Sequence, residues 1–313
     1  MPLLRFLPEA TTINFVGARY FAFAIDGLLL LASILSIAVH GFNLGIDFTG
    51  GVQIEVKYEQ TIDVQKLRAN VDHLGFKEAE INSVGGGQCN SPVNSCAMIR
   101  VQPASDAENQ IISKKIVGML GKSYKVLNIA VVGPKVSGEL FDAGILATLV
   151  AVACIALWVA FRFEWQYGVS AALATGHDVL VTAGLYSLLH LDFTLTSIAA
   201  LLTLAGYSIN DTVVVFDRIR ENRRKYKRMG LGDLINLSTN QMLTRTILTS
   251  AATAISIIPL LIFGGPSLFD FSAAILFGIV VGTFSSIYVA AALLLYLPAP
   301  AGKVSADTGE AVA

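Results

Sequence analysis

The residues best suited to chemistry in this sequence are charged side chains inside apolar segments. Asp211 follows Asn210 within residues 193–216, a run otherwise apolar enough to cross a bilayer. A charged aspartate at the centre of a membrane helix costs on the order of 3 kcal/mol, so such a residue is seldom present without a function. The sequence therefore predicts an ion or proton site around Asp211, with a partner elsewhere in the chain.

Arg245 is the candidate partner, because it opens residues 245–264, which would enter the membrane on the side where residues 193–216 leave it. A neighbouring guanidinium favours the charged form of a carboxylate, whereas burial disfavours it. A carboxylate held between these two effects can exchange a proton when helices shift, as proton coupling requires. The alternative interpretation is a static ion pair that joins the two helices.

Polar side chains in three of the predicted spans recur every three or four residues, which places each set on one helix face. These residues are Thr175, Asp178, Thr182 and Tyr186, then Thr203, Tyr207 and Asp211, then Arg245, Thr249 and Thr253. Together the three faces predict a hydrated seam. Asp178, next to His177, is either a second relay member or a carboxylate hydrogen-bonded for packing. The predicted proton pathway comprises Asp211, Arg245, Asp178, Asn210 and Tyr207.

Composition indicates the class of protein to which this site belongs. The chain has 313 residues, of which 54% are hydrophobic and 14% charged, too apolar a balance for a soluble domain. We expect a multi-pass membrane protein with six spans, at residues 20–39, 139–160, 167–190, 193–216, 245–264 and 270–297. Asp26, inside the first span near its cytosolic end, is interpreted as an acid that reaches the headgroups.

The loops predict the orientation. Residues 190–192 and 264–270 contain no Lys or Arg, whereas residues 217–244 are rich in both. Positive charge stays on the cytoplasmic side, so this basic loop and both termini are expected inside, and residues 40–137 outside. The loop also contains acidic residues and no nucleic-acid motif, so we expect no nucleic-acid partner.

Residues 40–137 have the polarity and periodicity of a soluble domain. Alternating segments predict strands at 51–59, 78–85, 97–103 and 124–133, with helices at 61–75, begun by Thr61, and 105–121. The order βαββαβ is that of a ferredoxin-like domain. The predicted organisation is therefore 1–39 with the first span, 40–137 as this domain, 138–297 with the other spans, and a tail at 298–313.

The cysteines and the absence of catalytic motifs limit the chemistry that the sequence predicts. Cys89 and Cys96 flank a short loop of the external domain, either as a disulfide formed in an oxidising compartment or as two unlinked thiols. A metal site is disfavoured because no further Cys or His completes a tetrahedral set. Cys154, in an apolar span, is interpreted as a packing residue. We find no nucleotide-binding loop and no nucleophile motif, so neither cofactor nor covalent catalysis is expected.

Five motifs occur in order along the chain: GIDFTGG (45–51), GYSINDTVVVFDRIREN (206–222), Arg245 in LTRTILTS, FGGP (263–266) and GTFSSIYVA (282–290). Together they resemble the SecF family, the smaller membrane subunit of the bacterial SecDF complex. The resemblance covers the whole chain except the C-terminal tail.

The resemblance implies half of an RND-type transporter that pairs with SecD into a twelve-helix bundle in the bacterial inner membrane, with its soluble domain periplasmic. It also implies association with the SecYEG channel and use of the proton gradient in late export of unfolded preproteins. Proton conduction is carried over to Asp211 and charge coupling to Arg245. Two alternatives stay open: a proton-driven exporter of small molecules or lipids, and a non-conducting assembly subunit.

The motif GIDFTGG lies where the first span meets the external domain. Gly50 and Gly51 permit backbone conformations or close approaches denied to other residues, and Asp47 could accept hydrogen bonds from turn amides. These three residues are predicted to form a joint that couples the domain to the bundle.

Overall fold

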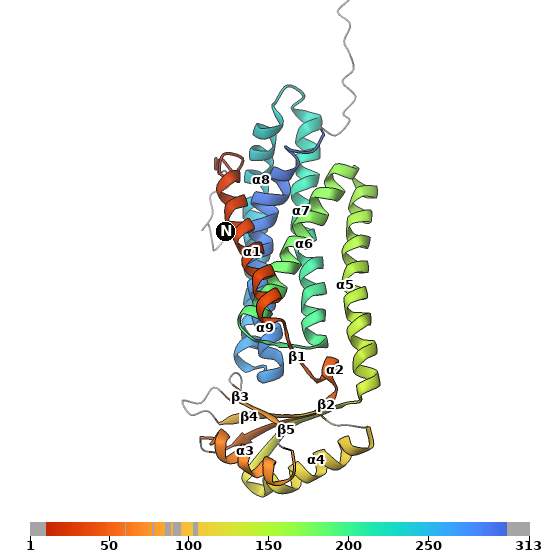
Figure 1. Ribbon diagram of the computed structural model, residues 1–313. Coiled ribbons are helices and arrows are strands. Elements are labelled where there is room, and N and C mark those ends of the chain that lie inside the picture. Colours follow the sequence, from red (N-terminus) through yellow and green to blue (C-terminus); the bar gives the residue numbers. More distant parts are fainter. Residues whose placement is uncertain are drawn as a thin grey trace, which may run out of the picture.

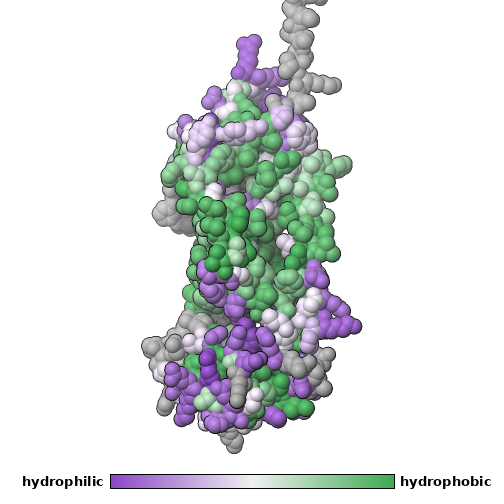
Figure 2. Space-filling view, in the orientation of Figure 1, coloured by the Kyte–Doolittle hydropathy of each residue, from purple (hydrophilic) through white to green (hydrophobic). Residues whose placement is uncertain are grey.

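The computed structural model consists of a bundle of long helices with a small sheet domain at one end (Figure 1). It describes residues 11–59, 61–76, 78–84, 89, 95–102 and 106–298. The predicted tail therefore lies outside the described residues except for Pro298. Hydrophobic side chains cover the visible face of the bundle, and hydrophilic ones gather at its two ends and over the sheet domain (Figure 2).

Five described helices are long and apolar enough to cross a membrane. They are α1 (Arg19–His40), α5 (Pro134–Arg162), α7 (Leu195–Lys225), α8 (Leu231–Phe263) and the segment Leu268–Leu293. The last of these comprises most of α9 (Pro266–Ser285), the π-helix η3 (Ser286–Ala290) and α10 (Ala291–Leu293). The chain is thus a helical membrane protein.

The sixth expected span corresponds to α6 (Trp165–Leu188), which has 24 residues but is not among the five apolar helices. Its polar residues, including Thr175, Asp178 and Thr182, are buried inside the bundle. Helix α6 packs against α1, α5, α7 and α9 and leaves apolar side chains such as Leu173 and Leu188 exposed. Only its exposed side therefore needs the apolarity of a lipid-facing helix. The sixth span stays a prediction.

The basic region 217–244 is not the long loop that the sequence suggested. Helix α7 continues to Lys225 and α8 begins at Leu231, so only residues 226–230 connect them. Arg223, Arg224 and Lys225 lie in the last turn of α7, where positive charge interacts favourably with the helix dipole. The positive charge that the sequence assigned to a loop therefore lies partly in the last turn of α7.

The sheet domain contains four antiparallel strands in the order β3-β4-β2-β5. The strands are β2 (Gly51–Tyr58), β3 (Glu80–Ser83), β4 (Cys96–Val101) and β5 (Tyr124–Val132). Helix α3 (Val64–His73) follows β2, and α4 (Asp106–Leu120) with a short 3-10 turn, η2 (Gly121–Ser123), precedes β5. Both helices cover the sheet face that points away from the bundle (Figure 1).

Alternation along the strands builds the core of this domain. Val52, Ile54 and Val56 of β2 are fully buried, and Ile99 of β4 packs beside them. Alternate side chains of a strand point to opposite faces, so Gln53 and Glu55 lie on the other face, toward the bundle.

Helix α3 begins two residues later than expected. Asp63 is its N-cap, and Oδ1 of Asp63 accepts hydrogen bonds from the backbone amides of Gln65 at 3.0 Å and Lys66 at 3.1 Å. The assignment of the start to Thr61 was wrong, because a carboxylate two positions later satisfies the free amides of the first turn.

A second, two-stranded sheet lies between the domain and the bundle. Strand β1 (Asn43–Leu44), just after α1, pairs in parallel with β6 (Asp192–Phe193), just before α7. The single-turn helix α2 (Ile46–Thr49) connects β1 to β2 (Figure 1). The chain thus joins α1, α7 and the external sheet within a few residues.

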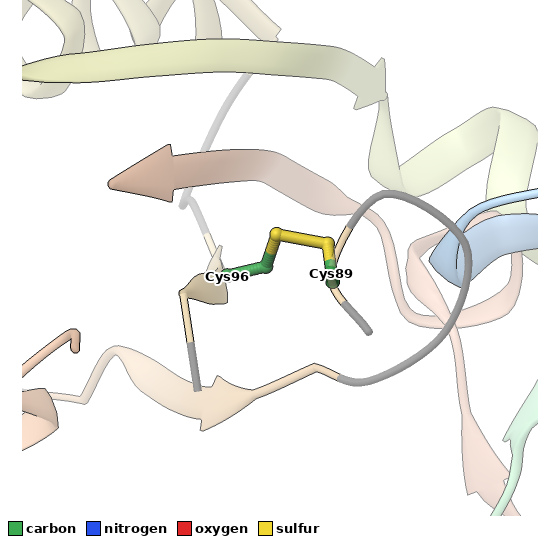
Figure 3. Close-up of a disulfide and its surroundings, with 2 residues drawn as sticks. All are labelled: Cys89 and Cys96. Atoms are coloured by element: carbon green, nitrogen blue, oxygen red, sulfur yellow. A yellow bond between two sulfur atoms is a disulfide. The ribbon is translucent and has the colours of Figure 1, made fainter. Parts of the chain in front are cut away.

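Cys89 and Cys96 form a disulfide with an S–S distance of 2.01 Å (Figure 3). Cys96 is the first residue of β4, so the bond fixes the end of this strand to the preceding loop. Cys154 on α5 is exposed, which contradicts its interpretation as a packing residue. In a membrane span an exposed thiol can face lipid, so it needs no protein neighbour.

Helix α4 offers a matched test of the domain core. Ile116 is fully buried and Ile111 is 53% exposed on the same helix. Ile116→Ala should lower the stability of the domain by about 2–5 kcal/mol, because it leaves a cavity. Ile111→Ala should stay within about 0.5 kcal/mol of the wild type. Hydrogen–deuterium exchange of β2 and β4 amides in the full-length protein measures both, and equal protection in the two variants would contradict this assignment of the core.

Candidate functional site

The carboxylate of Asp178 lies at the centre of the polar interior of the bundle. Its Oδ2 accepts hydrogen bonds from Ser208 of α7 at 2.5 Å and from Ser285 of α9 at 2.7 Å. Its Oδ1 lies 3.1 Å from Nδ1 of His177. One fully buried acid of α6 therefore joins three helices.

Glycines of α9 make this approach possible. A Cβ on Gly282 would lie 3.3 Å from Cβ of Ser208 and 3.5 Å from Oδ2 of Asp178. One turn earlier, a Cβ on Gly278 would lie 2.5 Å from Leu204. Small residues let two membrane helices pack closely, and here they bring the serine hydroxyls to the carboxylate.

Asp26 does not reach the headgroups as the sequence suggested. Its side chain is buried, and its Oδ1 lies 3.8 Å from Nε2 of His177. The residue occupies the face of α1 that packs on α6. The expectation failed because depth along a span says nothing about the side of the helix on which a residue lies.

Asp211 is 3% exposed, as expected for an interior acid. Its Oδ1 accepts a hydrogen bond from Thr249 of α8 at 3.4 Å, and its Oδ2 is buried without a hydrogen-bond partner among the described residues. Its carboxylate is therefore only partly satisfied inside the protein.

Arg245 does not pair with Asp211 within the part of the chain that the structure describes. Its side chain is exposed and lines a cavity of about 480 Å³ together with Asp217, Arg218 and Glu221. The long arginine side chain can extend toward the polar end of the helix, where charge costs less. The predicted direct ion pair is thus absent from this arrangement.

Tyr207 belongs to a second chain of hydroxyls. Its Oη donates to Ser250 of α8 at 2.8 Å, and Oγ of Ser250 lies 2.6 Å from Oγ1 of Thr283 on α9. Asn210, in contrast, is exposed on the outer surface of α7. The structure therefore brings Tyr207, Asp178 and Asp211 into the interior and leaves Asn210 outside it.

The predicted polar face of α6 points inward throughout. Thr175, Asp178, Thr182 and Tyr186 are all buried. Oγ1 of Thr175 and Oγ1 of Thr182 have no hydrogen-bond partner among the described residues. Unpaired buried polar atoms are costly, so these two hydroxyls are suited to hydrogen-bond water inside the bundle. In the described part of the chain no cluster of His, Cys, Asp and Glu could hold a metal ion.

The motif GIDFTGG forms a compact joint. Asp47 accepts a hydrogen bond from the backbone amide of Leu195, the first residue of α7, at 2.9 Å. Gly50 has φ +74°, and a Cβ there would lie 3.3 Å from Cα of Pro134, the first residue of α5. Gly51, at φ 128°, starts β2. The joint therefore contacts α5, α7 and the sheet, with glycines at the two strained positions.

Further charges, missed at the sequence level, hold the domain to the bundle. Arg100 of β4 pairs with Asp192 at 3.1 Å, and the amide of Asp192 donates to Oδ2 of Asp270 at 2.9 Å. Asn43 donates to Asp192 at 2.7 Å. No local pattern marks these residues, because they come from four separate segments and meet only in the folded chain.

A cavity of about 590 Å³ opens between the sheet and the membrane end of the bundle. Its lining is mixed: the acids Asp47, Glu55, Asp192 and Asp270 contribute to it, together with apolar side chains such as Phe269. The domain therefore does not pack tightly on the bundle across this whole surface.

Comparison with known proteins shows the family to which this chain belongs. The family described as "Protein export membrane protein SecD/SecF, C-terminal" matches residues 112–299, and the "SecD/SecF GG Motif" family matches residues 35–62. The protein translocase subunit SecF of Vibrio alginolyticus is 40% identical over 94% of this chain and 93% of its own length. The chain belongs to the SecF family.

Other relatives agree with this membership. The SecF subunit of Cereibacter sphaeroides is 42% identical over 97% of this chain and 95% of its own length. A crystal structure of SecDF, a translocon-associated membrane protein from Thermus thermophilus, matches with a TM-score of 0.82 and 40% identity over 93% of this chain. A SecDF structure in the super-membrane-facing form matches with a TM-score of 0.66 and 39% identity over 94% of this chain. This SecF-family chain spans 39% of each solved SecDF chain.

The joint generates a prediction. Gly50→Val should destabilise it by about 1–3 kcal/mol, because a β-branched residue is strained at positive φ and its Cβ would press on Pro134. Hydrogen exchange should accelerate in α2 and in the first turn of α5. Gly118→Val on α4 is the control, since a Cβ there meets nothing within 4 Å. Unchanged exchange in Gly50→Val would show that the joint tolerates a side chain.

Proposed function

We propose that this SecF-family chain is a subunit of the Sec protein translocase that couples proton flow through its helix bundle to late export of preproteins. The observation that carries the proposal is the incompletely satisfied buried carboxylate of Asp211 on α7, the helix whose first residue is held by Asp47 of the joint. A change of protonation inside the bundle and a movement of the external domain would thus act on one helix.

A proton route through the interior is supported by the arrangement of acids and hydroxyls. Asp211 with Thr249, Tyr207 with Ser250, and Asp178 with Ser208 and Ser285 all lie between α6, α7, α8 and α9. The available work is roughly 2.3 kcal/mol per charge for each 100 mV of membrane potential. Arg245, at the edge of this region, acts on Asp211 electrostatically without a direct ion pair.

The coupling to the outside runs along α7. This helix has 31 residues and carries Asp211 in its middle and the hydrogen bond from Leu195 to Asp47 at its start. A helix transmits displacement along its axis because its backbone is fully hydrogen-bonded. The cavity between the sheet and the bundle gives the domain room to tilt when α7 and α5 move.

The membrane topology follows from the same elements. We propose six spans, with α6 as the one enclosed by the others, and both termini in the cytoplasm of a bacterial inner-membrane protein. The basic end of α7 is then cytoplasmic, by the positive-inside rule. The sheet domain is then periplasmic and ferredoxin-like, and a disulfide between Cys89 and Cys96 suits that oxidising compartment.

A SecD partner is supported by the outer surface of α7. Thr203, Gly206, Asn210 and Asp217 are exposed and recur at steps of three, four and seven residues, so they form one stripe. Small and polar residues are unusual against lipid and typical of helix–helix contacts in membranes. We propose that SecD covers this stripe, and that Asn210 acts there instead of in the proton pathway. The SecYEG channel and unfolded preproteins are the further partners that a translocase subunit requires.

Two alternatives fit less well. A proton-driven exporter of small molecules or lipids needs an apolar pocket for an amphiphile, whereas four carboxylates, those of Asp47, Glu55, Asp192 and Asp270, line the cavity at the sheet. An assembly subunit with static buried charges needs those charges to be paired, and Oδ2 of Asp211 has no hydrogen-bond partner among the described residues.

Replacement of Asp211 tests the proposed function. Asp211→Asn should abolish the part of preprotein export that depends on the proton gradient, because the amide cannot take up or release the proton. The complex with SecD should still assemble, since the amide keeps the size of the side chain. Export into inverted membrane vesicles, measured with and without the gradient, gives the result.

Asp142→Asn is the control, because Asp142 is an exposed acid on α5 outside this network. Loss of assembly in Asp211→Asn would favour the structural alternative. Full gradient-dependent export in Asp211→Asn would remove Asp211 from the proton route.

The proposed SecD surface has its own test. Gly206→Leu should reduce co-purification with SecD, because a large side chain would hold the partner helix away. Gly27→Leu on α1 is the matched control, since a Cβ at either glycine meets nothing within 4 Å. Equal recovery of SecD with both variants would place the partner on another surface of the bundle.

A further inference from the structure

The carboxylate of Asp26 is buried with no hydrogen bond of its own. The residue is 4% exposed on α1, and both of its carboxyl oxygens lack a hydrogen-bond partner among the described residues. An isolated charge in such a place is very costly, so the group must either hold a proton or face a positive charge. The titratable group that faces it is the imidazole of His177 on α6, with Nε2 3.8 Å from Oδ1.

His177 lies between two acids. Its Nδ1 is 3.1 Å from Oδ1 of Asp178, and its Nε2 is 3.4 Å from the backbone carbonyl of Asp26 as well as close to the Asp26 carboxylate. A neutral imidazole has one N–H and can donate to only one side, whereas the protonated ring donates to both. Asp178 is on the same helix as His177, and Asp26 is on α1. When Asp178 holds the N–H on Nδ1, the contact with α1 gains its donor only from a second proton on Nε2.

The other groups around His177 set the boundary of this cluster. Helices α7 and α9 contribute the hydroxyls of Ser208 and Ser285, which both donate to Asp178. Arg19, at the start of α1, donates instead to Tyr20 and Tyr296. Within the described residues, the recorded ion pairs of His177 are those with Asp26 and Asp178.

We infer that Asp26, His177 and Asp178 form a second proton-binding unit, separate from Asp211, in which protonation of His177 fastens α1 to α6. The inference rests on the proposed function, because the proton on His177 has a role only if proton flow is coupled to movement of the external domain. Asp178 thereby becomes a member of a relay instead of a carboxylate bonded only for packing.

The position of α1 gives the unit a mechanical role. Helix α1 runs directly into β1 and the joint, so a shift of α1 reaches the external domain by a route that does not use α7. Two turns beyond His177, Gly184 lies so close to Ser33 that no side chain would fit, and Oγ of Ser36 is 2.9 Å from Oγ of Ser187. The tight contact near the joint can act as a pivot, and the imidazole as the contact that is made or released.

The test measures the imidazole itself. The chain contains 4 histidines, so the full-length protein labelled with ¹⁵N-histidine and reconstituted with SecD gives few signals, and the one missing in His177→Gln is assigned to His177. We expect this signal to titrate, and its midpoint to move by about one pH unit or more in Asp26→Asn, as removal of a charge within about 4–6 Å does. Asp26→Glu should retain the titration, and Asp142→Asn should leave the midpoint unchanged.

A His177 signal that does not titrate, or that is indifferent to Asp26→Asn, would overturn the inference. Export is the second measurement. His177→Gln should lower gradient-dependent export while SecD still co-purifies. Full export in this variant would overturn a coupling role for Asp26, His177 and Asp178. The failure of the inference is distinguishable from that of the proposed function. The ¹⁵N signals do not depend on export, and the Asp211→Asn result does not depend on His177.

Discussion

The compensation of buried acids inside the bundle is the constraint on which the rest of the structure depends. Lipid tails offer no hydrogen bonds, so a carboxylate at this depth must find its donors on neighbouring helices. Both carboxylate oxygens of Asp178 have partners, namely two serine hydroxyls and an imidazole. The packing reflects this arrangement. A Cβ on Gly282 would lie tightly against Cβ of Ser208. Helix α6 packs against α1, α5, α7 and α9, so its buried side can carry polar residues.

The same need for polar partners shapes the junction between the bundle and the sheet. The free amide at the start of α7 is satisfied by Asp47, and Arg100 of the sheet is satisfied by Asp192 beside that helix. Each bond completes one element with a group from another. These polar contacts flank an apolar one, because Phe48 of the joint packs on Phe141 of α5 and Phe193 of β6. The adjoining cavity, which several acids line, is the space that remains between the sheet and the bundle.

Much of this arrangement could be predicted from the sequence, and the failures have physical causes. Periodicity found the strands of the sheet and an inward face containing Asp178 and Asp211, because burial imposes those periods. It placed Asn210 beside Asp211, although adjacent residues on a helix point about 100° apart and Asn210 is exposed. It paired Arg245 with Asp211 by depth alone, and in the described chain the two interact electrostatically but form no direct ion pair. Asp26 was misjudged because its partner, His177, is 151 residues away in the chain.

The buried acids differ in how completely they are satisfied, and this difference bears on mechanism. Among the described residues, Asp178 has bonds to both oxygens, Asp211 to one, and Asp26 to neither. If the bundle had evolved only for rigidity, each acid would be expected to be as fully bonded as Asp178, since an unsatisfied buried group lowers stability by about 1–3 kcal/mol. In the coupling that we propose, the unbonded oxygens of Asp211 and Asp26 are the positions at which a helix shift would change protonation.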